Sequence, residues 1–508
     1  MTNPNDLLID RMEERQALRQ LLGRPRGRAG AEMALVTGRR RVGKTFLLSH
    51  TWPADQTFHF VAAEGTSTVN RRELIQAVNQ RFGLALDPGD YPNWRTVFKM
   101  LFELNASEPL VIVLDEFQYL MGKKDSAPSS LAATWDLLTT DRPLALVLCG
   151  SAVRTMEALQ AGDAALHGRF ARTITVQPFD YFDAATMLPF ATARECAVAY
   201  GVVGGTPQYL EALDGPSTLD AAIASAVLAP GGHVRQQVET LIDQESGLRN
   251  RQVYKALLRA MGAGRTLANE VADYAGTEQG TATKVMLSTL TSLGYVAAER
   301  NHDAKSNEAI RFRLSDPALR FQHEVVEPFR SELARYAPAD VWTDHIAQRI
   351  DTYMGRVFEF IAEQAYHRHR TRLGLPMVET WGRWEGAVPI RGTATRERQS
   401  IEIDVVAKLS DGRMLTGAVK WGDLGIGVHN KHLRDLSALA NSGYAWARQA
   451  LEPESPLIYA AGGELPDDFK ARAAQDGHPV IVLTLEEMYR GRTVRGANGT
   501  RSEPQALS

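Results

Sequence analysis

An eight-residue segment, Gly38–Thr45, constrains the fold of this chain more than any other part of its 508 residues. It fits the pattern G-x-x-x-x-G-K-[ST], follows an apolar run at 33–36 and precedes a helix-forming run that begins at Phe46. Glycines in the segment let the backbone curl its N–H groups around phosphate oxygens, and a helix start adds its positive dipole end. The sequence therefore predicts a strand, a phosphate-binding loop and a helix in succession.

The residue types of this loop indicate its ligand. Lys44 would bridge the terminal phosphates of a nucleoside triphosphate, and the Thr45 hydroxyl would bind Mg²⁺. A glycine-rich turn with an exposed lysine is the alternative, but the pattern arises by chance in only about one chain in fifty of this length. We therefore predict that ATP and Mg²⁺ bind here. The predicted nucleotide-binding residues of the loop are Gly38, Arg39, Arg40, Arg41, Val42, Gly43, Lys44 and Thr45.

A second motif is an apolar strand, 110–114, that ends in two carboxylates, Asp115 and Glu116. Charges at the end of a buried strand need partners. Asp115 would hold the magnesium, and Glu116 would orient or deprotonate the attacking water. Alone, such a strand could end in an ordinary surface turn, but together with the loop it predicts a hydrolysis site.

Two further residues are candidates for that site. Ser151 follows a third apolar strand, 144–149, and could reach the γ-phosphate; the alternative is a helix N-cap before Ala152. Arg169 is a candidate arginine finger, since a delocalised cation offsets charge that spreads over a transferred phosphoryl group. The alternative for Arg169 is a solvated surface position.

Length and patterning predict several domains. Strands alternate with helices over the first part, helical patterns follow, and then three helices and two short strands describe a winged helix before strands return. The predicted divisions are an α/β core at 1–180, a helical lid at 181–247, a winged helix at 248–325, a second α/β domain at 326–490 and a mobile tail at 491–508.

Composition narrows the class of protein. A formal charge of −3 gives no general support for a dedicated nucleic-acid binder, and the two cysteines cannot form a disulfide framework. No run of about 18 apolar residues and no leader pattern is present, so the sequence predicts a cytoplasmic protein without a membrane segment.

The order of the motifs resembles the prokaryotic archaeal-type P-loop ATPases, which are related to the AAA+ and STAND classes. Beyond the loop, the resemblance rests on segments 8–15, 114–118, 150–151, 168–169, 204–210 and 314–321. It implies that Arg11 and Pro207 border the adenine ring. From the sequence alone, the Gly-Gly-Thr-Pro segment that ends at Pro207 is a rigid turn that opens a helix.

The winged helix makes a poor DNA reader by itself. Its predicted recognition helix, 279–293, carries only one basic residue, Lys284, and the wing adds Arg300 and Lys305. Affinity for DNA depends largely on neutralised phosphates. An interdomain or protein-partner contact is therefore favoured over DNA contact.

The C-terminal domain resembles the restriction-endonuclease-like nucleases. The resemblance implies a metal site in which Asp404 and an acid at 418 share the ion and Lys420 stabilises developing charge. Position 418 is alanine, which cannot ligate a metal, although Glu402 or Glu359 could supply the missing oxygen. The site is interpreted as a degenerate, binding-only remnant, with a rewired nuclease as the alternative.

Together these features predict a Mg²⁺-dependent ATPase that acts as a nucleotide-driven switch coupled to the nuclease-like domain. The alternatives are an ATP-gated regulatory scaffold with little turnover and an ATP-gated DNA-processing nuclease. DNA and a protein partner remain candidate ligands, and an arginine finger could act between subunits of a homo-oligomer.

Overall fold

The structure, a computed structural model, describes residues 11–22, 30–104, 108–122, 126–137, 143–216, 218–245, 247–305, 308–389 and 398–492. The predicted tail therefore lies outside the described residues from 493 onwards, as do residues 23–29. The chain forms two compact units. The first contains Met1–Pro178, Thr206–Gln208 and Gln244–Arg249; the second contains Phe179–Gly205, Tyr209–Asp243 and Asn250–Ser508.

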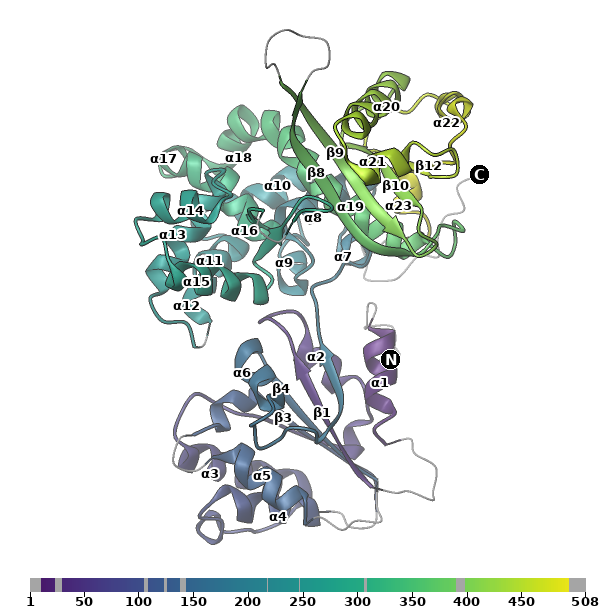
Figure 1. Ribbon diagram of the computed structural model, residues 1–508. Coiled ribbons are helices and arrows are strands. Elements are labelled where there is room, and N and C mark those ends of the chain that lie inside the picture. The colour runs from purple at the N-terminus through teal and green to yellow at the C-terminus, as the bar shows by residue number, and fades with distance from the viewer. Residues whose placement is uncertain are drawn as a thin grey trace. The chain divides into compact units, whose positions relative to one another are not determined.

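The first unit contains a five-stranded parallel sheet in the order β2-β3-β4-β1-β5 (Figure 1). This confirms the predicted parallel α/β fold. The strands are β1 (Ala31–Thr37), β2 (Thr57–Val61), β3 (Leu110–Asp115), β4 (Leu144–Gly150) and β5 (Phe170–Thr175). The helices are α1 (Met12–Arg19), α2 (Lys44–Ser49), α3 (Ser67–Phe82), α4 (Trp94–Glu103), α5 (Ala127–Trp135) and α6 (Val153–Glu157).

Burial explains why this sheet is parallel. Every residue of β3 and β4 is buried, as near-continuous apolar strands are when helices cover both faces. One apolar cluster contains residues of α3, α4 and α5, with Trp94 and Phe98 at its centre. A second contains Leu18 of α1 and Leu47 of α2. The two clusters take alternate residues of β1, so they lie on opposite faces of the sheet.

Helices dominate the region after the first sheet. They are α7 (Tyr181–Met187), α8 (Ala193–Val203), α9 (Pro207–Glu211), α10 (Leu219–Ile223), α11 (His233–Glu239) and α12 (Leu241–Gln244). Three helices and a two-stranded antiparallel ribbon follow: α13 (Arg251–Gly262), α14 (Ala268–Ala275), α15 (Thr281–Ser292), β6 (Val296–Glu299) and β7 (Arg311–Leu314). The N-cap of α14 is Leu267, and Glu270 accepts from the backbone N–H groups of Thr266 and Leu267.

The C-terminal part contains a second five-stranded sheet, in the order β12-β11-β10-β9-β8. Its strands are β8 (Val378–Pro389), β9 (Arg398–Leu409), β10 (Met414–Lys420), β11 (Leu457–Ala461) and β12 (Val480–Thr484). The helices of this part are α16 (Pro317–Phe321), α17 (Arg330–Leu333), α18 (Pro338–Val341), α19 (Ile350–His369), α20 (Ile426–Asn441), α21 (Ala445–Ala450), α22 (Phe469–Ala473) and α23 (Leu485–Met488).

Strand β8 has no counterpart among the sequence-based predictions. It contains Gly382, Gly386 and Pro389, which are depleted in strands, and charged residues interrupt its apolar pattern. These residues are tolerated because β8 is the edge strand of its sheet, paired only with β9.

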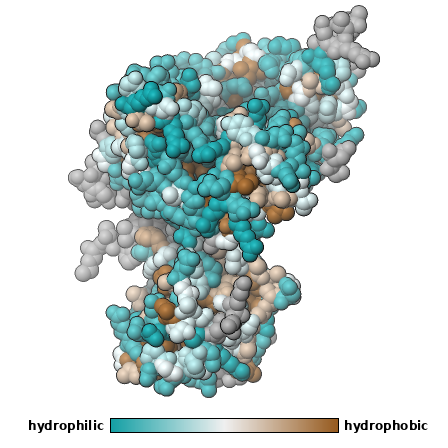
Figure 2. All heavy atoms as spheres, turned by 90° about the vertical axis from the view of Figure 1, so that its left-hand side faces the viewer, coloured by the Kyte–Doolittle hydropathy of each residue, from teal (hydrophilic) through white to brown (hydrophobic). Residues whose placement is uncertain are grey.

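The hydropathy of one face of the molecule is shown in Figure 2. The face shown in Figure 2 is mostly hydrophilic, with apolar residues in small separate spots. Among the described residues, no helix combines the length and apolar character needed to cross a membrane.

Candidate nucleotide site and C-terminal acidic cluster

Sheet order brings the N-terminal candidates together. Strand β4 lies between β1 and β3 and pairs with both in parallel, so the carboxyl ends of all three strands meet at one edge. The loop at 38–45 leaves β1, Asp115 and Glu116 end β3, and Ser151 follows β4. Ser151 therefore lies between the loop and the carboxylates.

The loop owes its path to glycine. Gly38 has φ +149°, and a Cβ there would lie 2.4 Å from the carbonyl oxygen of Val176. Gly43 has φ +88° and precedes α2. The Lys44 Nζ donates to the carbonyl oxygens of Gly38 and Arg39, each at 2.8 Å. These acceptors are neutral, so the buried ammonium holds the two ends of the loop together and keeps its net charge for a phosphate.

Asp115 is an ionised carboxylate in a buried position. Its Oδ2 accepts from the Thr45 hydroxyl at 2.7 Å and lies 3.5 Å from His59 Nε2, while Oδ1 accepts from the Glu116 N–H at 2.9 Å. Burial alone would raise the pKa of Asp115, but hydrogen bonds from His59, Cys149, Thr45 and Glu116 together hold it well below its ordinary value. A carboxylate and a hydroxyl in contact are an oxygen donor set that fits Mg²⁺.

Glu116 occupies a left-handed backbone conformation, with φ +52°. Its Oε2 accepts from the Ser151 hydroxyl at 2.8 Å and from the Gln118 amide. Gly150 permits this approach, because a Cβ there would lie 2.4 Å from Gln118 Oε1. A non-glycine residue at positive φ is costly, and such strain gathers at functional sites. Ser151 does not cap a helix, since α6 has Ala152 as its N-cap.

Three residues between the two loop glycines contact other segments of the first unit. Arg40 donates to the Tyr119 hydroxyl at 3.0 Å, and Arg41 donates to Gln244 Oε1 at 2.5 Å. Val42 is buried in the apolar cluster with α1 and α2. The side chains of Arg40 and Arg41 therefore tie the loop to neighbouring segments.

Arg11 and Pro207 both lie near the loop. Arg11 precedes α1 at φ +68°, and its guanidinium donates to the Gln177 carbonyl and pairs with Glu14 at 3.1 Å. Pro207 begins α9, and a Cβ added at Gly43 would lie 3.8 Å from its Cγ. The turn that opens a helix is thus present, and its proline contacts the phosphate loop.

Arg169 is not brought to this site. It precedes β5, whose first residue Phe170 pairs with Met33, whereas the loop follows Thr37 at the opposite end of β1. Four residues of strand separate the two ends, or about 13 Å. Arg169 also forms two hydrogen bonds to Asp136, at 2.6 and 2.9 Å. Arg169 therefore does not lie beside the loop of its own chain, and its role as an arginine finger stays a prediction.

Three contributors to the site were missed from the sequence. His59, whose Nε2 lies 3.5 Å from Asp115 Oδ2, and Cys149 both lower the pKa of Asp115, and Gln118 donates to Glu116 and to Ser151. His59 carried a signal, because it lies between the apolar residues Phe58 and Phe60 of β2. Cys149 is buried, and burial raises the pKa of its thiol well above the ordinary value.

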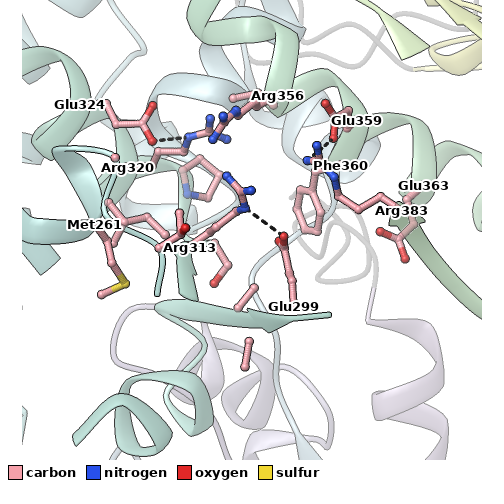
Figure 3. A pocket seen from close by; sticks show the side chains of 18 of the residues that line it. Met261, Glu299, Arg313, Arg320, Glu324, Arg356, Glu359, Phe360, Glu363 and Arg383 are labelled. Atoms are coloured by element: carbon pink, nitrogen blue, oxygen red, sulfur yellow. Dashed lines mark hydrogen bonds and ion pairs between the residues drawn. The ribbon is translucent and has the colours of Figure 1, made fainter. Parts of the chain in front are cut away.

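The C-terminal candidates come from three elements. Glu359 lies on α19, Glu402 and Asp404 on β9, and Lys420 ends β10. One carboxylate oxygen from each of the three acids lies within 4.8 Å of the others. Glu359 and Asp404 also line a cavity of about 800 Å³ (Figure 3).

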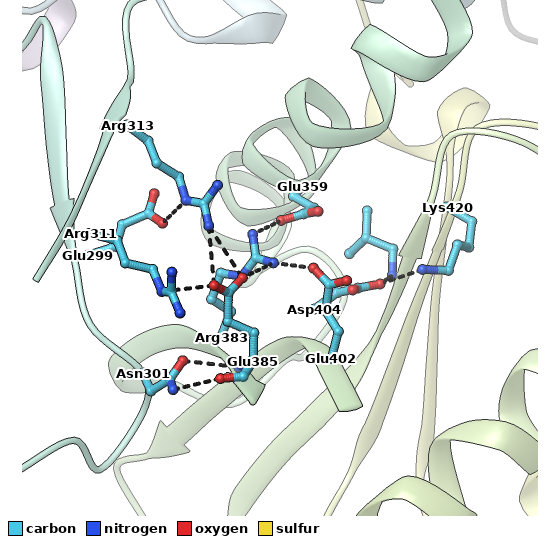
Figure 4. Close-up of polar contacts among 11 residues, drawn as sticks. Glu299, Asn301, Arg311, Arg313, Glu359, Arg383, Glu385, Glu402, Asp404 and Lys420 are labelled. Atoms are coloured by element: carbon cyan, nitrogen blue, oxygen red, sulfur yellow. Dashed lines mark hydrogen bonds and ion pairs between the residues drawn. The ribbon is translucent and has the colours of Figure 1, made fainter. Parts of the chain in front are cut away.

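These carboxylates are already neutralised by cations of the chain (Figure 4). Arg383 of β8 binds Glu359 at 3.2 Å and also binds Glu402. Lys420 Nζ donates to Asp404 Oδ2 at 2.8 Å, and the Val419 N–H donates to the same oxygen at 2.9 Å. Burial raises the pKa of Glu359 to about 7, although Arg383 opposes the shift. A metal ion would have to displace Arg383 and Lys420.

Ala418 packs into an apolar cluster with Leu424, Leu457 and Tyr459. A carboxylate at this position would enter that cluster rather than an open pocket. An acid at position 418 would therefore cost core packing and bury a charge.

The wing is bound to the edge of the C-terminal sheet. The Asn301 side chain exchanges two hydrogen bonds with the backbone of Glu385, at 2.8 and 3.0 Å, and the His302 N–H donates to the Arg383 carbonyl at 2.9 Å. Arg311 and Arg313 of β7 both pair with the Glu385 carboxylate, at 2.8 and 3.3 Å. Within the second unit, the β6–β7 ribbon and its loop therefore pack against β8 of the C-terminal sheet.

Comparison with known proteins gives matches in the N-terminal and in the C-terminal part of the chain. Residues 8–213 match a family described as an ATPase domain predominantly from Archaea, and residues 323–434 match a family of archaeal and bacterial proteins of unknown function. An uncharacterized protein of Methanocaldococcus jannaschii is 24% identical over 437 residues, which are 85% of this chain and 91% of that protein.

Two solved structures resemble part of the chain at low similarity. A Walker-type ATPase of Pyrococcus abyssi has a TM-score of 0.46 and 18% identity, and covers 63% of this chain and 97% of its own. The ORC2 protein of Aeropyrum pernix, in ADPNP and ADP complexes, has a TM-score of 0.44 and 16% identity, and covers 64% and 96%.

Proposed function

We propose that this chain, whose residues 8–213 belong to the family of P-loop ATPase domains found predominantly in Archaea, is a Mg²⁺-dependent ATPase that works as a nucleotide-driven switch. The observation that carries the proposal is the meeting of Lys44, the Thr45–Asp115 pair and the Glu116–Ser151 pair at one edge of the first sheet.

Each residue has a chemical role in this proposal. Lys44 exchanges its backbone carbonyl partners for the terminal phosphates. Thr45 and Asp115 hold Mg²⁺, which offsets phosphate charge. Glu116 orients the attacking water and accepts its proton. Ser151 and Gln118 fix the direction of the Glu116 carboxylate, since both donate to it.

The proposed switch uses the two segments that contact the loop from later in the chain. Pro207 lies against Gly43, and Gln244 accepts a hydrogen bond from Arg41. Both residues fall within the predicted helical lid at 181–247, and Gln244 lies near its C-terminal end. Movement of the loop on nucleotide binding or hydrolysis would reach the lid through both contacts.

For the C-terminal domain we propose a binding role without nuclease activity. The support is the Arg383 and Lys420 pairing described above, together with an alanine at 418. The wing contacts to β8 favour an interdomain role for the winged helix over DNA reading. A DNA-processing nuclease is the rival function.

The test is ATP turnover measured as phosphate release with and without Mg²⁺ and with and without DNA, together with sizing in ATP. The proposal expects multiple turnovers that need Mg²⁺. A single turnover or none would favour an ATP-gated scaffold. Mg²⁺-dependent DNA cleavage that disappears in Asp404→Ala would overturn the binding-only assignment.

A further inference from the structure

The cavity of about 800 Å³ in the second unit is lined by an unusual number of arginines. They come from the wing, from α16, from α19 and from β8. The five are Arg300, Arg313, Arg320, Arg356 and Arg383. A site of this volume is large enough for one nucleotide unit, since small-molecule sites span about 300–1,000 Å³.

Most of these cations have an acidic partner. Arg320 pairs with Glu324 at 3.0 Å, Arg313 pairs with Glu299 at 3.1 Å, and Arg383 binds Glu359 at 3.2 Å. Their charges are therefore satisfied within the chain. Arg300 and Arg356 have no ion pair or hydrogen bond among the described residues.

Arg356 is the informative member of the set. It rises from α19 beside the guanidinium groups of Arg313 and Arg320, as Figure 3 shows. Burial, and then the charge of Arg356, lower the pKa of Arg313 below its ordinary value. Arg313 and Arg320 keep their acidic partners, whereas Arg356 has none among the described residues, so its charge beside two further guanidinium groups is suited to an anionic ligand.

The acids that line the cavity do not cancel this charge. Glu299, Glu324 and Glu359 are paired with arginine, and Asp404 is paired with Lys420. Glu363 is the remaining acid, and burial, then the charge of Glu299, raises its pKa to about 7. At neutral pH the unpaired positive charge therefore exceeds the unpaired negative charge.

A flat apolar surface lies next to the arginines. Phe360 follows Arg356 by one turn of α19, lines the cavity and is 42% exposed. Its ring faces the same space in Figure 3. Aromatic rings stack on bases of any sequence, and guanidinium groups bind phosphate oxygens, so the two recognise the two ends of a nucleotide.

We propose that this cavity binds one phosphate-bearing nucleotide unit, with its phosphate on Arg356, Arg313 and Arg320 and its base on Phe360. The nucleotide is either free or the terminal unit of a nucleic-acid strand. The ligand bridges the wing and α19, and this site is separate from the loop at 38–45. It stands independently of the proposed ATPase function.

The test uses the full chain carrying Lys44→Ala, so that the first site does not contribute. The probes are AMP and a hexathymidylate with a 5′-phosphate, each compared with its unphosphorylated form by calorimetry. Arg356→Gln should weaken binding at least about tenfold, because it removes a charge-assisted phosphate contact. Phe360→Leu should weaken nucleotide binding and spare inorganic phosphate. Arg335→Gln, an exposed arginine outside the cavity, is the matched control and should change nothing.

The probes separate the two sources. Binding of AMP and of the hexamer supports a free nucleotide site that also accepts strand ends, and binding of the hexamer alone supports a strand end. Equal affinity for phosphorylated and unphosphorylated probes overturns the proposal, as does an Arg356→Gln protein that folds and binds like the parent. The thermal midpoint of each variant shows whether it is folded.

Discussion

The two acidic sites of this chain use the same residue types in opposite ways. At the end of β3, Asp115 is held by a hydroxyl, a histidine, a thiol and a backbone N–H, and the nearest ammonium, Lys44, rests on neutral carbonyls. At the C-terminal cluster, Arg383 and Lys420 bind the carboxylates directly. The Lys44 contacts at the first site are to neutral carbonyl oxygens, whereas the carboxylates of the second site are held in ion pairs within the chain. Acidic residues in proximity therefore do not define a metal site; their existing partners do.

The largest expected effect is a loss of ATP affinity when Lys44, which binds neutral carbonyl oxygens, is removed. Lys44→Ala should weaken ATP binding by about 100-fold or more, because a charge-assisted contact to the phosphates is lost. Fluorescent-nucleotide titration measures it. Lys420→Ala is the matched control and should bind ATP like the parent. Equal losses of ATP affinity in Lys44→Ala and Lys420→Ala would show that the two lysines do not differ in nucleotide binding.

The next effect concerns the proton acceptor. Glu116→Gln should keep ATP affinity and lose about 100-fold or more in turnover, since the amide cannot accept a proton but keeps its contact with Ser151. Steady-state phosphate release and nucleotide titration separate the two quantities. Normal turnover in this variant would place the base elsewhere.

Removing the built-in counter-ion should make the second site resemble the first. Arg383→Ala should destabilise the second unit by on the order of 2 kcal/mol, because Glu359 and Glu402 lose their partner. Added Mg²⁺ should raise the thermal midpoint of this variant and leave the parent unchanged. Arg413→Ala, which breaks a surface pair with Asp411, is the control. If Mg²⁺ changes the thermal midpoint of neither Arg383→Ala nor the parent, the ion pairs of Arg383 are not what prevents Mg²⁺ binding at the second site.

The smallest effect is a dependence of stability on pH at the edge of the second site. The pKa of Glu363 is raised from 4.5 to about 7 by burial. A raised carboxyl pKa means that the folded state keeps a proton that the unfolded state releases, so stability falls as pH rises from about 4.5 to about 7. Glu363→Gln should therefore raise the thermal midpoint at pH 8 by a few degrees and change it little at pH 4.5. Glu324→Gln, which removes the partner of Arg320, should not raise it.

The sequence was informative where chemistry is local. A glycine pattern between a strand and a helix predicts the loop, and an apolar run ending in Asp-Glu predicts where β3 ends, because both signals lie within a few residues. The parallel fold then determines that Ser151 lies between them. The roles assigned to these residues stay predictions until they are measured.

The sequence was uninformative where the surroundings of a residue depend on contacts with residues far away in the chain. Arg169 looked like a finger because linear order does not reveal which end of a strand faces the loop. Arg383 could not be predicted as a partner of the acids because it lies on β8, an edge strand whose glycines and charged residues interrupt the alternation typical of a strand. Glu359 and Glu402 could be suggested as neighbours of Asp404, but their neutralising partner could not.

The wing has a further consequence for the solubility of the protein. An edge strand exposes unpaired N–H and C=O groups, and these invite strands of other molecules to add to the sheet. On β8, the segment Asn301–His302 uses the backbone groups of Arg383 and Glu385 that face outward. The wing therefore protects the second sheet against self-association, and a chain that lost these contacts would be prone to polymerise through β8.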